Sequence, residues 1–156
     1  MTATIAPDKG TVADNQGKQA LAYGVIVNVF DPHFDSRYQQ QLQPEGFGQP
    51  SATSTSDEQA HALLEAATDQ LVEELRRSNP GMRILRRHEH FRVDGEDIQS
   101  TYLTNDSPLG GRETNWLVTV QRPEGLLFLI FVAPDNAFQS YEDTFQAMLY
   151  SVRFRR

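Results

Sequence analysis

Seven large apolar residues stand in an unbroken run near the end of the chain, from Leu126 to Val132. The flanking segments 123–125 and 134–136 contain proline, glycine, aspartate and asparagine, residues typical of turns. The run is too short to cross a bilayer as a helix, which needs about 20 apolar residues. It therefore predicts a strand, and a strand points alternate side chains to opposite faces. Exposing three of these side chains would cost about 5–9 kcal/mol, comparable with the whole stability of a domain, so we expect both faces to be covered.

Two segments repeat apolar residues at the three- and four-residue spacing of an amphipathic helix. In 57–78 the apolar stripe consists of Ala60, Leu63, Leu64, Ala67, Leu71 and Leu75, and in 137–150 of Phe138, Tyr141, Phe145, Met148 and Leu149. Pro80 and Gly81 follow the first stripe and are typical of a helix end. The pattern predicts one helix before the apolar run and one after it.

Stretches rich in β-branched and aromatic residues predict further strands. They cover residues 21–30, 82–93, 96–104 and 113–121, and a short strand is expected at 151–154. Asp94-Gly95 is a signal for a tight hairpin. We expect residues 1–20 to be an irregular lead-in with one short strand near residues 3–6, and 31–56 to be a long loop.

The order of these elements indicates an α+β fold. One strand and one helix precede four strands joined by hairpins, and a second helix follows. A mostly antiparallel sheet with helices packed on both faces is the simplest assembly of such elements, since each helix must bury its apolar stripe. The expected domain spans residues 21–156, after the lead-in 1–20.

Composition excludes several kinds of function. The chain has 156 residues, a net charge of −7 and a pI near 5.0, which argues against general nucleic-acid binding because that needs a basic surface. There is no cysteine, so neither a disulfide nor a thiolate metal site can form. We expect no transmembrane segment, because no stretch is long and apolar enough to span a bilayer.

The closest pair of histidines is His88 and His90, which would point to the same side of a strand and could both reach one metal ion. A metal site needs further ligands, which Asp97 or Gln99 of the next strand could supply, and the spacing is not that of an H-E-x-x-H helix. We therefore expect a solvated strand face here and no metal. No phosphate-binding glycine loop, nucleophile elbow or calcium loop occurs, so we expect no cofactor and no catalytic activity.

Charged residues elsewhere also have an ordinary interpretation. Six arginines fall within seventeen positions: Arg76, Arg77, Arg83, Arg86, Arg87 and Arg92. They could bind phosphate or an acidic partner, but acidic residues of the preceding helix are expected to pair with them. Glu58, His61 and Glu65 share one face of that helix and are expected to form a normal polar surface.

The candidate binding surface lies around the loop 105–112. Its residues are Tyr102, Asn105, Asp106, Ser107, Arg112 and Trp116. Loops held by a rigid sheet often carry recognition. Trp116 is the sole tryptophan and is expected to pack on the sheet; exposed beside Tyr102, it would mark a binding patch.

Two resemblances follow from particular segments. The C-terminal stretch from Phe138 to Phe154, which ends in Ser-Val-Arg-Phe, resembles the close of PsbP-like domains, α/β/α sandwiches that finish with a strand, a helix and a short terminal segment. The segments 78–83, 105–111, and 116–119 with 122–126 are similar to the C-terminal accessory region of some bacterial zinc metallopeptidases of the CaaX-prenyl-protease-like kind. The zinc-binding H-E-x-x-H helix of those enzymes has no counterpart here.

The resemblance implies a non-catalytic accessory or protein-binding domain, found outside the cytoplasm or at a membrane surface. Its partner would be another protein or the remainder of a longer chain, and the loops 31–56 and 105–112 would make the contact. Two alternatives stay open. The chain could shape substrate access to a protease domain that it does not itself contain, or it could bind a small ligand between sheet and helix.

Overall fold

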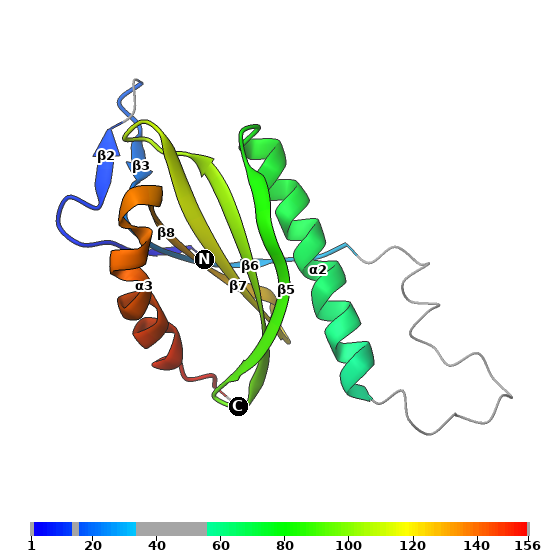
Figure 1. The fold of residues 1–156 in the computed structure, drawn as a ribbon. Helices are drawn as coiled ribbons and strands as arrows, with labels where there is room; N and C mark the ends of the chain where they lie inside the picture. The colour runs from blue at the N-terminus through cyan, green and yellow to red at the C-terminus, as the bar shows by residue number, and fades with distance from the viewer. Residues whose placement is uncertain (1, 14–15, 34–55, 156) are drawn as a thin grey trace, which may run out of the picture.

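The computed structural model describes residues 2–13, 16–33 and 56–155, apart from the side chain of His88. Its elements in chain order are β1 (Ala3–Ile5), β2 (Thr11–Ala13), β3 (Gln19–Leu21), β4 (Gly24–Phe30), α2 (Ser56–Ser78), β5 (Arg83–Val93), β6 (Glu96–Asp106), β7 (Arg112–Arg122), β8 (Gly125–Pro134) and α3 (Asp135–Tyr150) (Figure 1). Both predicted helices and the strands at 82–93, 96–104, 113–121 and the apolar run are confirmed.

Within the described residues the main sheet has six strands in the order β1-β4-β8-β7-β6-β5, and every neighbouring pair is antiparallel. β2 and β3 form a separate hairpin. The predicted α+β class with a mostly antiparallel sheet is confirmed. β8 pairs with β4 on one side and β7 on the other, which explains why its sequence is apolar throughout.

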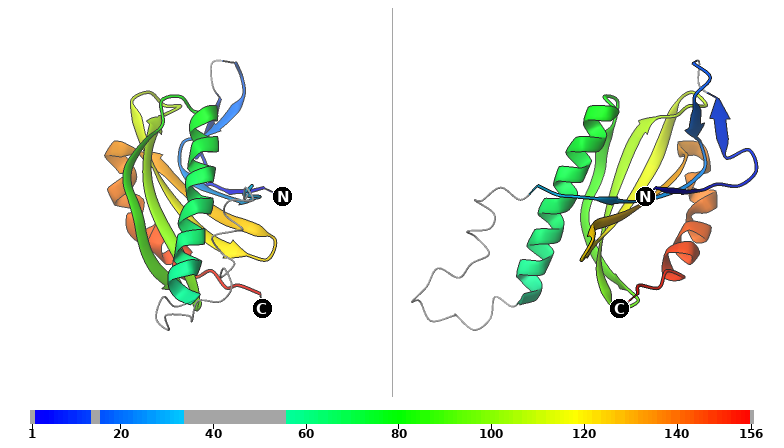
Figure 2. Two further views of the ribbon diagram at one scale, coloured as in Figure 1. Left: turned by 90° about the vertical axis from the view of Figure 1, so that its right-hand side faces the viewer. Right: turned by 180° about the vertical axis from the view of Figure 1, so that it is seen from behind.

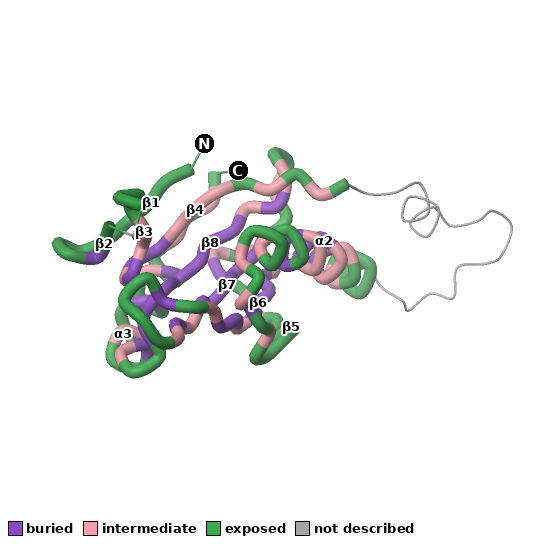
Figure 3. The backbone as a smooth tube through the Cα atoms, turned by 90° about the horizontal axis from the view of Figure 1, so that it is seen from above, coloured by how far each residue is buried: buried purple, intermediate pink, exposed green. Residues whose placement is uncertain are grey.

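Side chains of β8 alternate between two groups of buried residues. Leu129 and Phe131 belong to a group that we call the α3 cluster, and Phe128 and Ile130 to the α2 cluster. The α3 cluster includes Val25, Ile98, Trp116, Val118, Leu129, Phe131, Phe138, Phe145 and Leu149. The α2 cluster includes Leu64, Ala67, Leu71, Val72, Leu103, Leu117, Leu126, Phe128, Ile130 and Val132. Figure 2 shows α2 and α3 on either side of the strands, and Figure 3 shows buried residues along the length of β8.

The buried stripe of α2 differs in part from the sequence prediction. Leu64, Ala67 and Leu71 are buried as expected, but Thr68 is buried too, whereas Ala60 is exposed. Thr68 tolerates burial because its hydroxyl donates to the Leu64 carbonyl at 2.7 Å and lies 2.8 Å from the Thr119 hydroxyl.

Residues 1–20 are more regular than the predicted irregular lead-in. β1 forms near the expected position and pairs with β4, but the hairpin of β2 and β3 was missed. Its strands have three residues each, too few for an alternating pattern to be recognised. Most of the predicted loop 31–56 lies outside the described residues.

The strand expected at 151–154 is wrong. The Ser151 and Val152 amides donate to carbonyls of the last turn of α3, and the Phe154 amide donates to Asp94 Oδ2 at 2.8 Å. The guanidinium of Arg122 lies 5.1 Å from the centre of the Phe154 ring. Side chains therefore hold this tail in place without a strand partner.

The hairpin at Asp94-Gly95 is confirmed. Both residues have positive φ, 50° and 83°, as a two-residue turn of this kind requires. At the other end, the loop predicted over 105–112 is shorter, because the β6–β7 ladder continues to the pair Asp106 and Arg112.

Candidate functional site

A pocket of about 360 Å³ lies at the end of the sheet where the loop after Asp106 joins β6 to β7. Leu21, Ile26, Leu75 and Ile130 contribute an apolar wall. Polar side chains on its lining come from the end of α2, from β6 and from β7: Asn79, Asn105, Asp106, Glu113 and Asn115. The volume lies near the lower limit of the roughly 300–1,000 Å³ typical of small-ligand sites.

Glu113 and Asn115 are the most deeply buried polar residues in the lining of this pocket, only 6% and 3% exposed. They are two positions apart on β7, so both project to the same side of the sheet. Asn115 Nδ2 donates to Glu113 Oε1 at 3.0 Å. Glu113 Oε2 and Asn115 Oδ1 have no hydrogen-bond partner among the described residues. An unsatisfied buried acceptor costs about 1–3 kcal/mol, so such atoms point to a site that something else completes.

Burial raises the pKa of the Glu113 carboxyl, because removal from water disfavours the charged form. The hydrogen bond from Asn115 lowers this pKa in part. The charges of Asp135 and Asp106 raise it further, and the charge of Arg112 lowers it. A raised carboxyl pKa next to a pocket is a recognised sign of a functional site.

Arg112 lies beside the pocket, but its guanidinium is already hydrogen-bonded to other groups of the chain. Its Nη1 donates to Asp106 Oδ1 at 2.8 Å and its Nη2 to the Gly81 carbonyl at 3.0 Å. A Cβ atom at Gly81 would lie 2.6 Å from Asp106 Oδ2, so a larger residue there would require the Asp106 carboxylate to move. The one guanidinium described at the rim thus leaves the Glu113 carboxylate unpaired.

The predicted binding residues fall into two places. Asn105, Asp106 and Ser107 line the pocket, and Arg112 pairs with Asp106 beside it. Asn105 Nδ2 donates to Asn79 Oδ1 at 3.2 Å, which ties β6 to the end of α2. The loop itself is closed by a hydrogen bond from the Ser107 amide to the Gly111 carbonyl.

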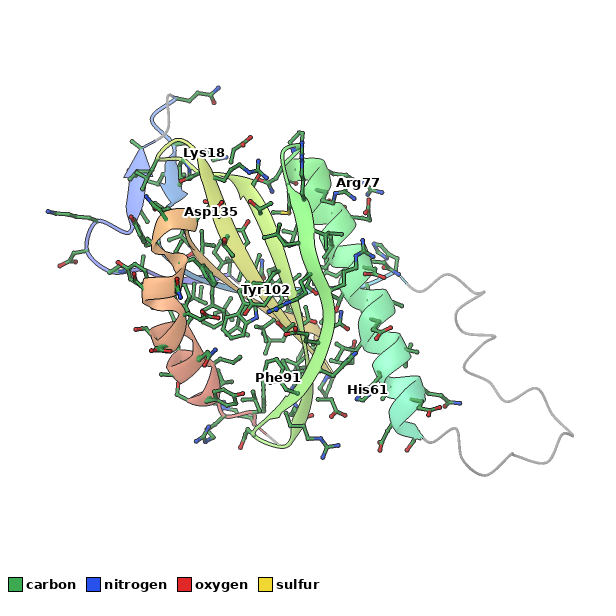
Figure 4. All side chains as sticks on the ribbon, viewed as in Figure 1. Lys18, His61, Arg77, Phe91, Tyr102 and Asp135 are labelled. Carbon is green, nitrogen blue, oxygen red and sulfur yellow. The ribbon has the colours of Figure 1, made fainter. Side chains whose placement is uncertain are left out.

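Tyr102 and Trp116 lie with the α3 cluster, on the other side of the sheet (Figure 4). Trp116 is only 5% exposed, and its indole Nε1 donates to Ser100 Oγ at 2.7 Å. The rings of Tyr102 and Trp116 stack with their centres 5.9 Å apart, and the Arg86 guanidinium lies 4.6 Å from the centre of the Tyr102 ring. Burial raises the pKa of Tyr102. An open pocket of about 620 Å³ lies here, but the Trp116 side chain is packed in the core and does not form an exposed binding patch.

His61 and His90 lie in a small cluster between α2 and the β5–β6 hairpin. His90 Nε2 lies 3.0 Å from Glu65 Oε1, and the His90 ring stacks on His61 with centres 4.6 Å apart (His61 is labelled in Figure 4). His61 Nε2 is 3.8 Å from Asp97 Oδ2. No group of three or more ligating side chains able to hold a metal ion is found among the described residues, which do not include the side chain of His88.

The arginine cluster pairs with acidic side chains of the same chain: Asp69, Glu73 and Glu74 lie on the preceding helix, as predicted, whereas Glu89 and Asp97 lie on β5 and β6. Ion pairs join Arg76 to Glu73, Arg77 to Glu74, Arg86 to Glu89, Arg87 to Asp69 and Arg92 to Asp97. All are exposed, so each contributes little to stability, about 0–1 kcal/mol. Five of these six arginines are therefore satisfied internally.

Sequence analysis missed Glu113 and Asn115. The alternation of β7 places Thr114, Trp116, Val118 and Val120 on one face, and the sequence pattern gave the odd-numbered positions of the other face no role. The structure buries both sides of this strand. The polar residues at 113 and 115 therefore face the interior. In the sequence, the signal for burial of this face was the apolar leucine at position 117.

No protein-family model matches the chain, and no curated protein does. The fold is similar to the crystal structure of a protein of unknown function, PA94 from Pseudomonas aeruginosa, described as a putative regulator. The TM-score is 0.57 at 8% sequence identity, and the match covers 100% of this chain and 83% of that one. This similarity concerns the fold alone. No helix among the described residues is long and apolar enough to cross a membrane.

Proposed function

We propose that this chain is a non-catalytic binding domain, built as an α/β/α sandwich of the PsbP-like kind, that acts as an accessory to another protein or to further parts of a longer chain. The two clusters, one containing residues of α2 and one residues of α3, support the sandwich. The resemblance of segments 78–83, 105–111, and 116–119 with 122–126 to metallopeptidase accessory regions suggests the class of partner.

One observation carries the proposal: buried acceptors without a partner among the described residues lie in a pocket beside the predicted contact loop. Glu113 and Asn115, whose Oε2 and Oδ1 atoms are buried without a hydrogen-bond partner among the described residues, line a pocket together with Asn105, Asp106 and Ser107. The loop is held firmly, since Arg112 bonds both Asp106 and the Gly81 carbonyl. A rigid rim around unsatisfied acceptors suits recognition of an external group.

Small-ligand binding is the second candidate, favoured by the size of the same pocket. The two candidates differ in what surrounds the bound group. A partner protein must also cover the loop tip, where Leu109 is 50% exposed, whereas a small ligand need not.

Site-specific photocrosslinking in the native cell tests the proposal. A benzophenone amino acid replaces Leu109 at the loop tip, and the matched control replaces the exposed Glu124 in the turn at the other end of β7. We expect one protein to be crosslinked from position 109 and not from 124. That protein, once identified and purified, should bind the chain and lose affinity for the Leu109→Glu variant. Equal adducts from both positions, or none from 109, would contradict the proposal and leave the small-ligand hypothesis.

A further inference from the structure

We propose that the pocket beside Glu113 and Asn115 binds a guanidinium group carried on an aliphatic stem, as in an arginine side chain. The inference rests on the proposed binding function and specifies its chemistry. Two residues that line the pocket have side-chain atoms without a partner among the described residues, Glu113 Oε2 and Asn115 Oδ1, and both atoms are acceptors. A ligand that completes the site must therefore bring N–H or O–H donors.

The charge of the site favours a cation over a neutral donor. Glu113 is a buried carboxyl, and the guanidinium described at the rim, that of Arg112, is occupied by Asp106 and the Gly81 carbonyl. Asp106 also lies on the pocket lining. Hydrogen bonds between a cation and a carboxylate are about twice as strong as those between neutral groups.

The geometry favours a planar donor over an ammonium ion. The acceptors belong to neighbouring side chains that are joined by the bond from Asn115 Nδ2 to Glu113 Oε1, so their positions are fixed relative to each other. A guanidinium presents several N–H groups in a rigid plane and can bond two acceptors at once. An ammonium is a compact, strongly hydrated charge that is more costly to bury.

The walls suit an aliphatic stem. Leu21, Ile26, Leu75 and Ile130 line the pocket, and its volume of about 360 Å³ accommodates a side chain rather than a large ligand. Long cationic side chains commonly pack their methylene groups on apolar surface while the charged end finds its partners. The apolar lining and the buried carboxyl of Glu113 together match the arginine side chain.

Heteronuclear NMR titration of the isotope-labelled full chain tests the inference. Two probes distinguish the source of the guanidinium: N-acetyl-arginine amide resembles an arginine within a protein, and free L-arginine represents a small molecule. N-acetyl-citrulline amide is the neutral control of nearly the same shape. We expect saturable shifts of the Asn115 side-chain amide and of the Glu113 backbone with an arginine probe, and none with the citrulline probe.

The Glu113→Gln variant removes the charge while it retains the shape and the acceptor for Asn115 Nδ2. We expect its affinity for the arginine probe to fall about tenfold or more, the size of a lost charge-assisted hydrogen bond. Glu124→Gln makes the same change in net charge at the far end of β7 and should leave the affinity unchanged. The backbone spectrum of each variant shows that it remains folded.

Stronger binding of N-acetyl-arginine amide supports a partner's side chain, and stronger binding of free L-arginine supports a small molecule. Equal binding of the citrulline probe, or no shifts with either arginine probe, overturns the inference. If the probes fail while Leu109 still crosslinks one partner, the guanidinium inference falls and the proposed binding function stands. If crosslinking fails as well, both fall.

Discussion

The α3 cluster and the α2 cluster share strands β7 and β8 but differ in what they bury. In the α3 cluster aromatic rings form a continuous group, in which Phe131 lies 5.0 Å from Trp116 and 5.2 Å from Phe145, between ring centres. Its main polar contact is satisfied, because the Trp116 indole donates to Ser100. This part of the molecule is built for packing.

The α2 side mixes aliphatic residues with buried polar ones. Thr68, Gln99, Thr101, Glu113, Asn115 and Thr119 are all buried there. Side-chain oxygens of Thr101, Glu113 and Asn115 have no partner among the described residues, and all three lie on this side. Glu113 and Asn115 also line the pocket, so the α2 side combines unsatisfied buried acceptors, which reduce stability, with a cavity.

The largest effect is expected from Phe131→Ala in the α3 cluster. Phe131 is fully buried and contacts two other rings, so its truncation should lower the free energy of unfolding by about 3–5 kcal/mol. Urea denaturation measures this. The control Leu85→Ala removes a side chain that is 59% exposed and should change stability by less than about 0.5 kcal/mol. A small loss for Phe131→Ala would show that this cluster is not the main packing centre.

Glu113→Gln should have the opposite effect on the free energy of unfolding and stabilise the protein by about 1–3 kcal/mol at neutral pH. The substitution removes a buried carboxylate charge whose Oε2 has no partner among the described residues. A gain in stability together with a loss of probe binding would separate function from folding. Denaturation curves of both proteins in the same buffer provide the comparison.

The pH dependence of this gain follows from the raised pKa of Glu113. In the unfolded chain the Glu113 carboxyl loses its proton near its ordinary pKa, about 4.3, whereas in the folded chain the raised pKa keeps this carboxyl protonated to higher pH. Native stability therefore falls as the pH rises from there through the folded-state pKa, and then levels off. Asp106, Asp135 and Arg112 act on the same carboxyl and remain in the variant. The gain should vanish below about pH 4; a gain that persists there would contradict the raised pKa.

The hydroxyl pair between α2 and β7 should give a smaller effect. Thr68 and Thr119 lie 2.8 Å apart between their Oγ1 atoms. Thr119→Val should cost about 1 kcal/mol, and the Thr68→Val, Thr119→Val double variant less than the sum of the single losses. A double-mutant cycle in urea measures this coupling. Strictly additive losses would mean that the two hydroxyls do not interact.

The smallest effect is expected at the histidine cluster. His90 and Glu65 are linked at 3.0 Å, but their side chains are 24% and 41% exposed. In a buffer acidic enough to protonate His90, Glu65→Gln should change stability by about 0.2–1 kcal/mol, and less in high salt because the ions screen the charged pair. Thermal denaturation at two salt concentrations tests this. A large loss would mean that this cluster holds α2 on the β5–β6 hairpin.

Local patterns in the sequence determined most of the elements. The stripes in 57–78 and 137–150, the unbroken run from Leu126 to Val132 and the turn at Asp94-Gly95 each depend on residues close together in the chain. Such patterns predict helices, strands and hairpins because their periods follow from backbone geometry. The α+β class followed from their order, whereas three-residue strands such as β2 were too short to be recognised.

Only the tertiary structure decided which face of β7 is the site. Alternation along 113–121 gives two faces, and the predicted packing of Trp116 on one of them said nothing about Glu113 and Asn115 on the other. In the fold, the end of α2 and the β2–β3 hairpin bring Leu75, Asn79 and Leu21 over these two residues. Burial and missing partners arise from segments distant in sequence, so the sequence predicted the loop at the rim but not the acceptors inside it.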